Sequence, residues 1–519
     1  MGKCGIKRWT VLGLLLIIFM CERAYAQTVN DEYERFKQEV NALFDKTAKK
    51  YNSQFESFRA KINKEFATFL EKEWKLAVID EPAPSPVKPE PEFERPTQGN
   101  RMLPNKEPLV RPFDTIAPAP LHPIKSAPIV PLRLLPDNEV VVVVPKKVIQ
   151  EEPVIPVATA EYTVNFEYLE NRVQIRFPED SRIQLGDIDK GNLSKAWKDL
   201  SGEQYNAMLV DCLAAKESLQ LCDWAFYQFL LAFTKQAYGD EQSPSAIITQ
   251  AYIFSQLGYK IRLASTDNNL HILFSYKDDL FDIPYFKVGG DKFYAFTLSP
   301  SSKIQFCDFT FPGEHPSTAV IRTLPIVPAN KSDRKEFKSE KNKDLVVSVE
   351  TNNNLMEFYN NYPACKWNIK VEASLSDDIK EQLYPSLSKA IQGKNDGEAA
   401  NILIDFVQTA FQYQRDDEQF GREKAFFGDE LFFYPYSDCE DRSVLYAILI
   451  KELLMLDVVL LEYPTHIATA VKFKEDVTGD YFMIDGEKYI VCDPTYIGAT
   501  IGESMESMRQ VGATIIRIN

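Results

Sequence analysis

The stretch SDCEDRSVLYAILIKELL, residues 437–454, places a cysteine at the start of a long apolar segment. The apolar residues after Cys439 recur with the spacing of one helix face, so the stretch predicts a helix that begins at this cysteine. Asp438, the residue before it, is a good N-cap. The unpaired N–H groups and partial positive charge of a helix N-terminus stabilise a thiolate. A nucleophilic thiol is therefore predicted at Cys439.

A histidine and an aspartate follow the cysteine at equal intervals. His466 lies 27 residues after Cys439, and Asp493 lies 27 residues after His466. Both stand in alternating segments rich in Val, Ile and Tyr, which predict neighbouring strands. The histidine would take the thiol proton and later give it to a leaving group, while the carboxylate would orient the imidazole. Each residue alone is more often structural, so the predicted triad depends on the three occurring together.

These motifs resemble those of the transglutaminase-like superfamily, thiol enzymes with a papain-like Cys-His-Asp arrangement. The shared features are an Asp-Cys pair that opens a helix, a strand that begins with histidine, and a later strand that ends in Asp493-Pro494-Thr495. Upstream, the segment FVQTAFQY (406–413) and the following Asp416 and Asp417 resemble the family's approach to the cysteine. The resemblance covers residues 386 to 500.

The resemblance implies that Cys439 is the nucleophile, His466 the general acid and base, and Asp493 the orienting carboxylate. Ser437 stands where the family often has a glycine, and Ile467-Ala468 replaces an aromatic residue that often follows the histidine. These departures bear on substrate preference and on the groups that would stabilise an oxyanion. Cys439, His466 and Asp493 themselves match the triad of the family.

A second, degenerate copy of the pattern is predicted upstream. The segment GGDKFYAFT (289–297) aligns with DGEKYIVCD (485–493). This alignment places Thr297 where Asp493 stands, so the second copy lacks the orienting carboxylate.

The other two positions of this copy follow from the same alignment. His271 matches His466, and Ser243 or a neighbour falls at the nucleophile position. Without a histidine oriented by a carboxylate, a serine is a weak nucleophile, so the copy is predicted to be inactive. The alternative is that two α/β segments share a hairpin pattern by chance. Different strand orders in the two segments would rule out a duplication.

The chain is expected to be an α+β multidomain protein, because 519 residues exceed the size of a single core. Composition and motifs divide it into seven segments. In chain order they are a signal peptide (1–26), a long amphipathic helix (27–80), a Pro-rich spacer (81–137), a β-rich segment (138–185), a degenerate transglutaminase-like module (186–310), a β-rich connecting module (311–385) and a transglutaminase-like catalytic domain (386–519).

Strand patterns lie in both β-rich segments. Residues 162–177 predict a hairpin with Asn171 at its turn. In the connecting module, Val346–Val349 is expected to pair with Trp367–Val371, and residues 332–344 are expected to form a charged loop.

Residues 1–26 have a basic start, an apolar core and small residues before a cut after Ala26, which predicts a secretory signal peptide. The mature protein is therefore expected to be exported, to the periplasm or outside the cell. Cys21 offers an alternative as a lipid-attachment site, but Ile18-Phe19-Met20 before it lacks the small residues that the lipid-attaching peptidase prefers. No other stretch is long and apolar enough to predict a membrane span.

The N-terminal part of the chain predicts a helix followed by a spacer. Residues 31–74 contain no Gly or Pro, and their aromatic and aliphatic residues follow helical spacing. This predicts an amphipathic helix with an aromatic stripe, which would serve self-association or docking on a partner. Between Pro82 and Pro136 lie 15 of the 31 prolines, so an extended spacer is expected. The apolar second half of the spacer is expected to lie along the following domains.

Charge and cysteine content exclude several classes of function. The formal net charge of −16 argues against nucleic acid or an anionic membrane as a partner. The six cysteines that remain after the predicted cleavage match no metal motif, and the four histidines form no two-histidine zinc motif. Neither a metal nor a cofactor is therefore predicted. Cys212 and Cys222 are candidates for one disulfide.

A Cys-His-Asp site attacks an amide to form an acyl-enzyme, which water or an amine then releases. The leading hypothesis is an exported thiol enzyme that hydrolyses amide bonds in a peptide or protein substrate. Crosslinking to an amine stays open, because the sequence does not display the acceptor site. The competing hypothesis is a non-catalytic scaffold or protein-binding protein of the cell envelope. Glu440 and Asp441 support it, because they would oppose a thiolate at Cys439 unless they point away.

Overall fold

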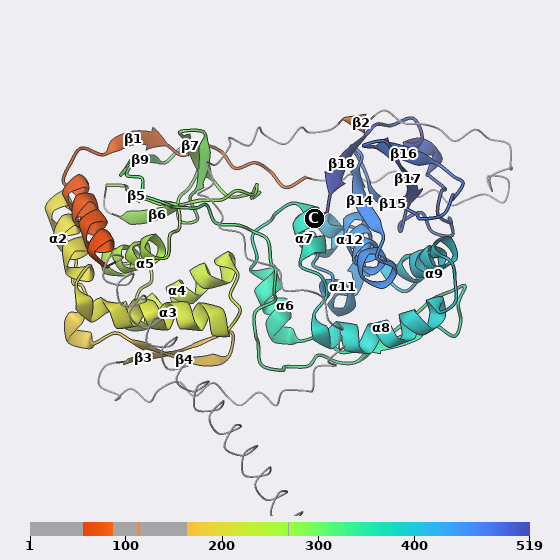
Figure 1. Ribbon diagram of the computed structural model, residues 1–519, viewed down its shortest axis with the longest axis horizontal. Coiled ribbons are helices and arrows are strands. Elements are labelled where there is room, and N and C mark those ends of the chain that lie inside the picture. Colours follow the sequence, from red (N-terminus) through yellow and green to blue (C-terminus); the bar gives the residue numbers. More distant parts are fainter. Residues whose placement is uncertain (1–55, 87–112, 115–162, 268, 519) are drawn as a thin grey trace, which may run out of the picture.

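The computed structural model describes residues 56–86, 113–114, 163–267 and 269–518 of the chain. These residues form a mixed α+β structure in two halves that lie side by side, each built on a six-stranded sheet (Figure 1). The predicted signal peptide, the start of the predicted N-terminal helix and most of the Pro-rich spacer lie outside the described residues.

The first half is built on a sheet of strand order β1-β9-β5-β6-β8-β7, here called the first sheet. Its strands are β1 (Lys75–Val78), β5 (Ile261–Ser265), β6 (Leu270–Ser275), β7 (Tyr285–Val288), β8 (Asp291–Tyr294) and β9 (Lys303–Phe306). The helices of this half are α2 (Lys190–Leu200), α3 (Asn206–Ser218), α4 (Asp223–Tyr238) and α5 (Pro244–Gln256). Phe226, Phe229 and Phe233 of α4 are fully buried, because residues three and four apart share one helix face.

A hairpin packs on the far side of these helices from the first sheet (Figure 1). Its strands β3 (Thr163–Tyr168) and β4 (Asn171–Arg176) pair antiparallel, so the predicted hairpin is confirmed. The turn is formed by Leu169 and Glu170, whose φ angles of 48° and 59° are left-handed. The prediction that Asn171 forms the turn is wrong, because this residue begins β4.

The second half is built on a sheet of order β16-β17-β15-β14-β18-β2, here called the second sheet. Its strands are β2 (Phe113–Asp114), β14 (Asp457–Glu462), β15 (Ile467–Lys472), β16 (Tyr481–Ile484), β17 (Glu487–Cys492) and β18 (Ala513–Arg517). The long helices beside it are α8 (Asp377–Ile391), α9 (Asp396–Thr409) and α12 (Cys439–Leu449). α12 packs against β14, β15 and α9, so all of its residues are buried. Since β2 belongs to the Pro-rich spacer, a short part of the spacer pairs with β18 of this sheet.

The two sheets share a strand order over five of their six strands. The first reads β9-β5-β6-β8-β7 and the second β18-β14-β15-β17-β16, and in each half a helix, α5 or α12, precedes the five strands. Neighbouring strands within both sets are antiparallel. The sixth strands differ, because β1 pairs antiparallel with β9 whereas β2 pairs parallel with β18. A difference in strand order, which would have ruled out a duplication, is absent from these ten strands.

The segment predicted as a β-rich connecting module contains more helix than strand, so that prediction is wrong. It contains one hairpin, β10 (Lys335–Lys338) with β11 (Val346–Val349), two short helices, α6 (Asn353–Asn360) and α7 (Trp367–Glu372), and the start of α8. The strand predicted at Trp367–Val371 is α7. Its buried residues are Trp367, Ile369, Lys370 and Val371, and it packs against α12. The partner of β11 instead lies inside the segment predicted as a charged loop, where Phe337 is buried between exposed Glu336 and Lys338.

The predicted N-terminal helix is described over residues 56–70, where it is helical. It ends at residue 70, so its predicted end at residue 74 is wrong. The segment assigned to this helix, 27–80, also includes Lys75–Val78, which forms β1 and pairs with β9. The aromatic stripe packs here against its own chain. The ring centroid of Phe66 lies 4.4 Å from that of Trp197 and 5.1 Å from that of Phe309.

Two further expectations concern covalent links and membranes. Cys212 and Cys222 are both free thiols, so the candidate disulfide is not formed. Cys212 is buried in α3, while Cys222 is the residue before α4. Within the described parts of the chain, no helix combines the length and the hydropathy needed to cross a membrane.

Candidate active site

Cys439 is the first residue of α12 and is only 4% exposed. The preceding Asp438 begins the helix, and its backbone N–H donates a hydrogen bond of 3.2 Å to the carboxylate of Asp441. The Cys439 sulfur accepts a hydrogen bond from the backbone N–H of Ile467, the residue after His466. Ser443, one helical turn further along α12, donates to the carbonyl of Ile467 at 3.1 Å. These contacts hold the start of α12 against the start of β15.

His466 and Asp493 meet at one end of two paired strands, β15 and β17. His466 directly precedes β15 and Asp493 directly follows β17, and Nε2 of the histidine lies 2.9 Å from Oδ2 of the aspartate. The other carboxylate oxygen accepts from the backbone N–H groups of Thr495 and Tyr496, at 2.9 and 3.1 Å. The aspartate is thereby fixed, and it fixes the imidazole in turn. The remaining ring nitrogen, Nδ1, is buried without a hydrogen-bond partner.

The structure therefore brings His466 and Asp493 into contact and places Cys439 beside Ile467, the residue after His466. Among the described residues, the thiol and Nδ1 of His466 do not share a hydrogen bond. Because Asp493 occupies Nε2, Nδ1 is the nitrogen left to accept a thiol proton. This is the division of roles that a Cys-His-Asp nucleophile needs.

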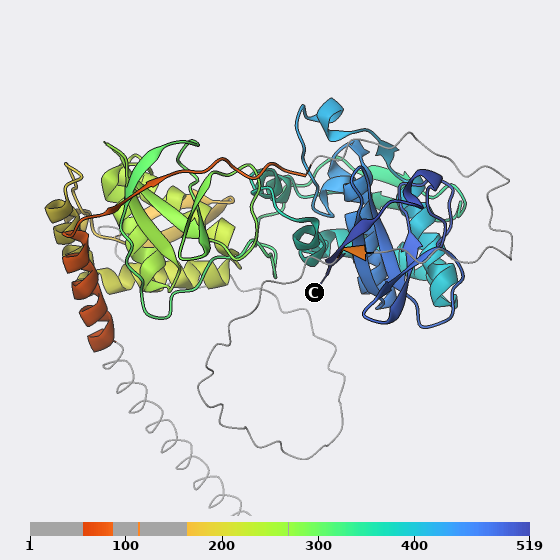
Figure 2. The same cartoon turned by 90° about the horizontal axis from the view of Figure 1, so that it is seen from above.

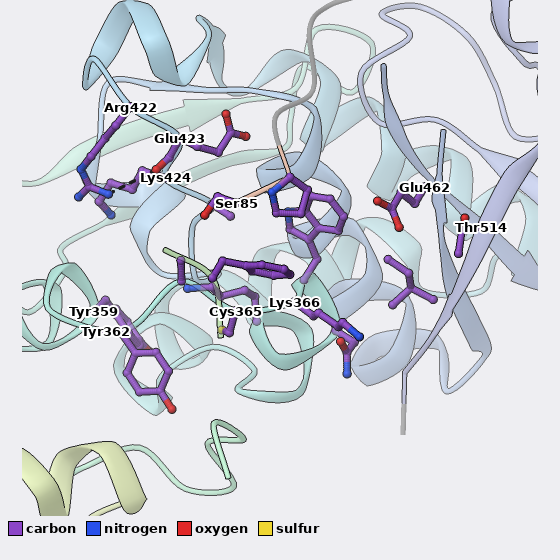
Figure 3. Close-up of a pocket in the computed structure, with 18 of the residues that line it drawn as sticks. Ser85, Tyr359, Tyr362, Cys365, Lys366, Arg422, Glu423, Lys424, Glu462 and Thr514 are labelled. Carbon is purple, nitrogen blue, oxygen red and sulfur yellow. Dashed lines mark hydrogen bonds between the residues drawn. The ribbon is translucent and has the colours of Figure 1, made fainter. Parts of the chain in front are cut away.

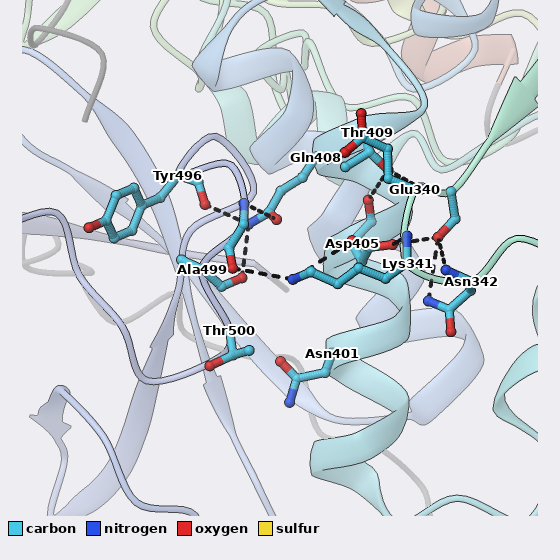
Figure 4. Close-up of polar contacts among 12 residues, drawn as sticks. Glu340, Lys341, Asn342, Asn401, Asp405, Gln408, Thr409, Tyr496, Ala499 and Thr500 are labelled. Atoms are coloured by element: carbon cyan, nitrogen blue, oxygen red, sulfur yellow. Dashed lines mark hydrogen bonds and ion pairs between the residues drawn. The ribbon is translucent and has the colours of Figure 1, made fainter. Parts of the chain in front are cut away.

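Gln408 of α9 holds the loop that carries Asp493. Its Nε2 donates to the carbonyls of Asp493 and Tyr496 at 3.0 and 2.9 Å, and its Oε1 accepts from the N–H of Gly498 at 3.1 Å. Figure 4 shows Gln408 of α9 pointing to the loop of residues 496–500, while Asp405 and Thr409 face residues 340–342. Gln408 lies in the segment 406–413 that carries the family resemblance, but the sequence predicted no role for it, since its partners lie about 90 residues later in the chain.

Arg442 joins α12 to the end of α9. Its side chain is fully buried and donates to the carbonyls of Gln408 and Phe411 at 3.2 and 2.8 Å, and to the hydroxyl of Ser437 at 3.2 Å. Burial lowers the pKa of Arg442 to about 10. This arginine was also missed by the sequence analysis, although it stands three residues after Cys439.

A cluster of buried carboxylates surrounds the thiol. Asp416, Asp438 and Glu440 each offer an oxygen within 4.8 Å of the others. Burial raises the pKa of Asp416 to about 7. Burial, with the neighbouring carboxylates adding to it, raises the pKa of Asp438 and Glu440 well above the ordinary range. One oxygen of Asp438 and one of Glu440 have no hydrogen-bond partner.

These three carboxylates could hold a divalent cation. Oxygen ligands suit hard cations such as Ca²⁺, Mg²⁺ and Mn²⁺. A cation would pair the two orphaned oxygens and offset the mutual repulsion that raises the carboxyl pKa values. No metal was predicted from the sequence, because neither its cysteines nor its histidines match a metal motif, and Asp416 lies 22 residues before Asp438.

The same carboxylates act on the thiol. Burial raises the pKa of Cys439 well above its ordinary value, and the charges of Glu440 and Asp438 raise it further. This is opposite to the effect expected from the helix N-terminus. The thiol donates a hydrogen bond of 3.0 Å to Glu440. A proton or cation that neutralises Glu440 would free the thiol to give its proton to His466.

The first half holds the equivalents predicted for the degenerate copy. Nδ1 of His271 lies 2.9 Å from the hydroxyl of Thr297, so these two residues meet as His466 and Asp493 do, but through the other ring nitrogen. Ser243 is the N-cap of α5, and its hydroxyl oxygen accepts from the N–H of Ala246 at 3.3 Å. It therefore occupies the place of Asp438 in α12, and Pro244 occupies the place of Cys439. Burial lowers the pKa of His271.

This chain matches no protein-family model, no curated protein and no solved structure. The function of the site is therefore argued from its own residues and geometry.

Proposed function

We propose that this chain is an exported thiol enzyme of the transglutaminase-like class that hydrolyses amide bonds in peptides or proteins. The observation that carries the proposal is the 2.9 Å contact between His466 Nε2 and Asp493, with Nδ1 unpartnered and the Cys439 sulfur bonded to the N–H of Ile467. A buried imidazole with one nitrogen fixed and the other free, next to a thiol, is suited to proton transfer.

In the proposed reaction, Nδ1 of His466 takes the proton of Cys439 as the sulfur attacks the carbonyl carbon of the amide. The imidazolium then gives this proton to the leaving amine, and the C–N bond breaks to leave a thioester on Cys439. Water, losing a proton to Nδ1, attacks the thioester. The carboxylic acid leaves, and the thiol regains the proton. Asp493 keeps Nε2 protonated throughout.

The order of the elements supports the class. A helix that begins with cysteine precedes a strand that follows histidine, and the paired strand ends in aspartate. Hydrolysis is preferred to crosslinking, because water is always present and a crosslinking enzyme needs a dedicated site for the amine. On this proposal, the half that carries His271 and Thr297 is a related module without a nucleophile.

A second candidate function is a non-catalytic envelope scaffold or protein-binding protein that uses the same fold. It is favoured by the buried Cys439 thiol, whose pKa is raised by burial and by Glu440. The two functions predict different thiols: one that reacts with substrate, and one that is inert under all conditions.

Hydrolysis of a mixed peptide library by the purified full chain under reducing conditions separates them. Activity is expected for the wild type and is expected to be lost in Cys439→Ala and His466→Ala. Cys307→Ala is the matched control, because Cys307 is an equally buried thiol in the first half. No cleavage by a folded wild type, with and without Ca²⁺, would contradict the enzyme and favour the scaffold.

A further inference from the structure

A cavity of about 500 Å³ lies between the two halves (Figure 3). Its walls come from the ends of α6 and β14, from α7, from β18 and from residues 422–425. Residues 75–86 run from the first sheet toward the second half (Figure 2), and Ser85 and Pro86 complete the wall. Ser85 is held in place by Asp282, which accepts from its backbone N–H at 3.0 Å.

The cavity borders the thiol site through two of its lining residues. Glu462 is the last residue of β14 and pairs with Ile467, whose N–H binds the Cys439 sulfur. Glu423 shares a hydrogen bond with Glu440, which accepts the thiol hydrogen bond. Cys439 itself is not among the residues that line the cavity, so Glu462 and Glu423 are the link between the cavity and the thiol.

One lysine in the wall has no carboxylate partner. Lys370 is 4% exposed, and its Nζ lies 3.7 Å from the ring centroid of Phe427. Within the described residues it forms no ion pair. Of the other cations in the wall, Lys366 pairs with Asp279 at 3.0 Å, Arg517 with Asp485 at 2.7 Å and Lys424 with Glu430, while Arg422, which is exposed, also forms none among these residues. A buried ammonium without a counter-ion is unfavourable, so this position is suited to an anion supplied by a ligand. The lowered pKa of Lys370, caused by burial, agrees with a missing partner.

The rest of the wall is suited to an apolar body. Phe281, Tyr359, Tyr362, Trp367 and Ile515 line the cavity beside Lys370. Cavities of this kind, with apolar walls and a few fixed polar groups, are typical ligand sites at the junction of two domains.

We propose that this cavity binds a carboxylate group of a peptide next to an apolar residue, with Lys370 as the anion-binding group. That the bound peptide is a substrate rests on the proposed function, because the cavity borders the residues that contact the Cys439 thiol. The carboxylate comes either from an acidic side chain or from a peptide C-terminus. The chemistry at Lys370 is the same for both.

Binding to the full-length Cys439→Ala protein tests this without turnover. Three peptides share one apolar sequence and differ in charge: one amidated and neutral, one with a free C-terminal carboxylate, and one amidated with a glutamate side chain. At least one carboxylate peptide should bind 10-fold or more tightly than the neutral one by calorimetry. The better of the two identifies the source of the carboxylate. Equal binding of all three peptides would overturn the inference.

Two added variants locate the effect. Lys370→Met should abolish the preference for a carboxylate, while Lys366→Met, a cavity-lining lysine already paired with Asp279, should keep most of it. If Lys370→Met does not fold, the Cys439→Ala protein still provides the test, because its tighter binding of a carboxylate peptide should be lost at high salt. A preference that survives in folded Lys370→Met would overturn the inference. Because the Cys439→Ala protein cannot turn the peptides over, the binding result does not depend on whether the wild type hydrolyses amide bonds.

Discussion

His466 and Asp493 are separated by 27 residues in the sequence and by 2.9 Å in space, from Nε2 to Oδ2. The contact is possible because β15 begins directly after the histidine and β17 ends directly before the aspartate. Two antiparallel neighbours bring such ends together. The contact occupies Nε2 and leaves Nδ1 as the ring nitrogen that has no hydrogen-bond partner among the described residues.

Asp493→Asn should lower kcat/KM by roughly 10³-fold, because an amide can favour the wrong imidazole tautomer. The variant should fold, since Oδ1 can still accept from the N–H groups of Thr495 and Tyr496. Peptide hydrolysis measures the effect. Asp457→Asn, an exposed aspartate on β14, is the control and should keep full activity. Unchanged hydrolysis in Asp493→Asn would refute the role of this carboxylate.

Gln408→Leu should lower both stability and activity. The substitution leaves the buried carbonyls of Asp493 and Tyr496 without their donor, which costs about 1–3 kcal/mol for each unsatisfied group. Urea unfolding measures the stability change, and hydrolysis measures the effect on the Asp493 loop. Gln412→Leu, at an exposed position just beyond α9, should change neither. If Gln408→Leu matched the wild type in both assays, the loop would not depend on this side chain.

Asp416→Asn should stabilise the protein at pH 8 and have little effect near pH 4. Burial raises the pKa of Asp416 to about 7, whereas an aspartate in an unfolded chain titrates near about 3.9. Between these values the folded protein holds a proton that the unfolded chain has released, so the stability from this group falls as pH rises. The neutral variant does not undergo this loss and should gain on the order of 4 kcal/mol at pH 8.

Urea unfolding in EDTA at pH 4 and pH 8 provides this comparison. Asp417→Asn is the control, because the neighbouring side chain is exposed and pairs only with Arg415. An Asp416→Asn protein no more stable than the wild type at pH 8 would contradict the raised pKa.

Ca²⁺ should stabilise the protein and activate its thiol. A cation between Asp416, Asp438 and Glu440 would bind the folded chain only, and so would raise Tm with the logarithm of its concentration above Kd. It would also offset the Glu440 and Asp438 charges that raise the pKa of Cys439, so alkylation at pH 7 should become faster. Calorimetry and iodoacetamide labelling measure the two effects, with Mg²⁺ and Mn²⁺ compared.

Glu440→Gln separates this site from non-specific binding. The variant should lose most of the stabilisation by Ca²⁺ and should show faster alkylation of Cys439 without any cation. Stabilisation by Ca²⁺ of the same size in wild type and Glu440→Gln would place the cation elsewhere.

The local parts of the site could be predicted from the sequence. Cys439 stands beside a helix-starting Asp438, and His466 and Asp493 stand at the ends of strands with clear alternation. Each residue therefore carried its own local signal, and only the contact between them required the fold.

The groups that support the site could not be predicted, because their partners are remote. Gln408 bonds to a carbonyl 85 residues away, and Asp416 meets Asp438 and Glu440 although they lie 22 and 24 residues later in the chain. The burial that raises the pKa of Cys439 also depends on residues that are remote in the sequence. Sequence reasoning included the helix N-terminus, which favours a thiolate, but could not include desolvation, which opposes it.

The prediction of a strand at Trp367–Val371 was wrong for a different reason. Five residues with mixed apolar and polar character fit a short strand and a turn of helix equally well. The choice was made by tertiary packing of Trp367 and Val371 against α12, a helix that begins more than 60 residues later.

Mass spectrometry of an acyl-enzyme tests the central claim most directly. The full chain is incubated with an activated acyl ester at neutral pH with Ca²⁺, quenched in acid and digested. The account predicts an acyl group on Cys439 that accumulates in the wild type and is strongly reduced in His466→Ala, with Cys365, the thiol in the wall of the adjacent cavity, left unmodified. An acyl group absent from Cys439, or formed equally without His466, would contradict a catalytic triad in this protein.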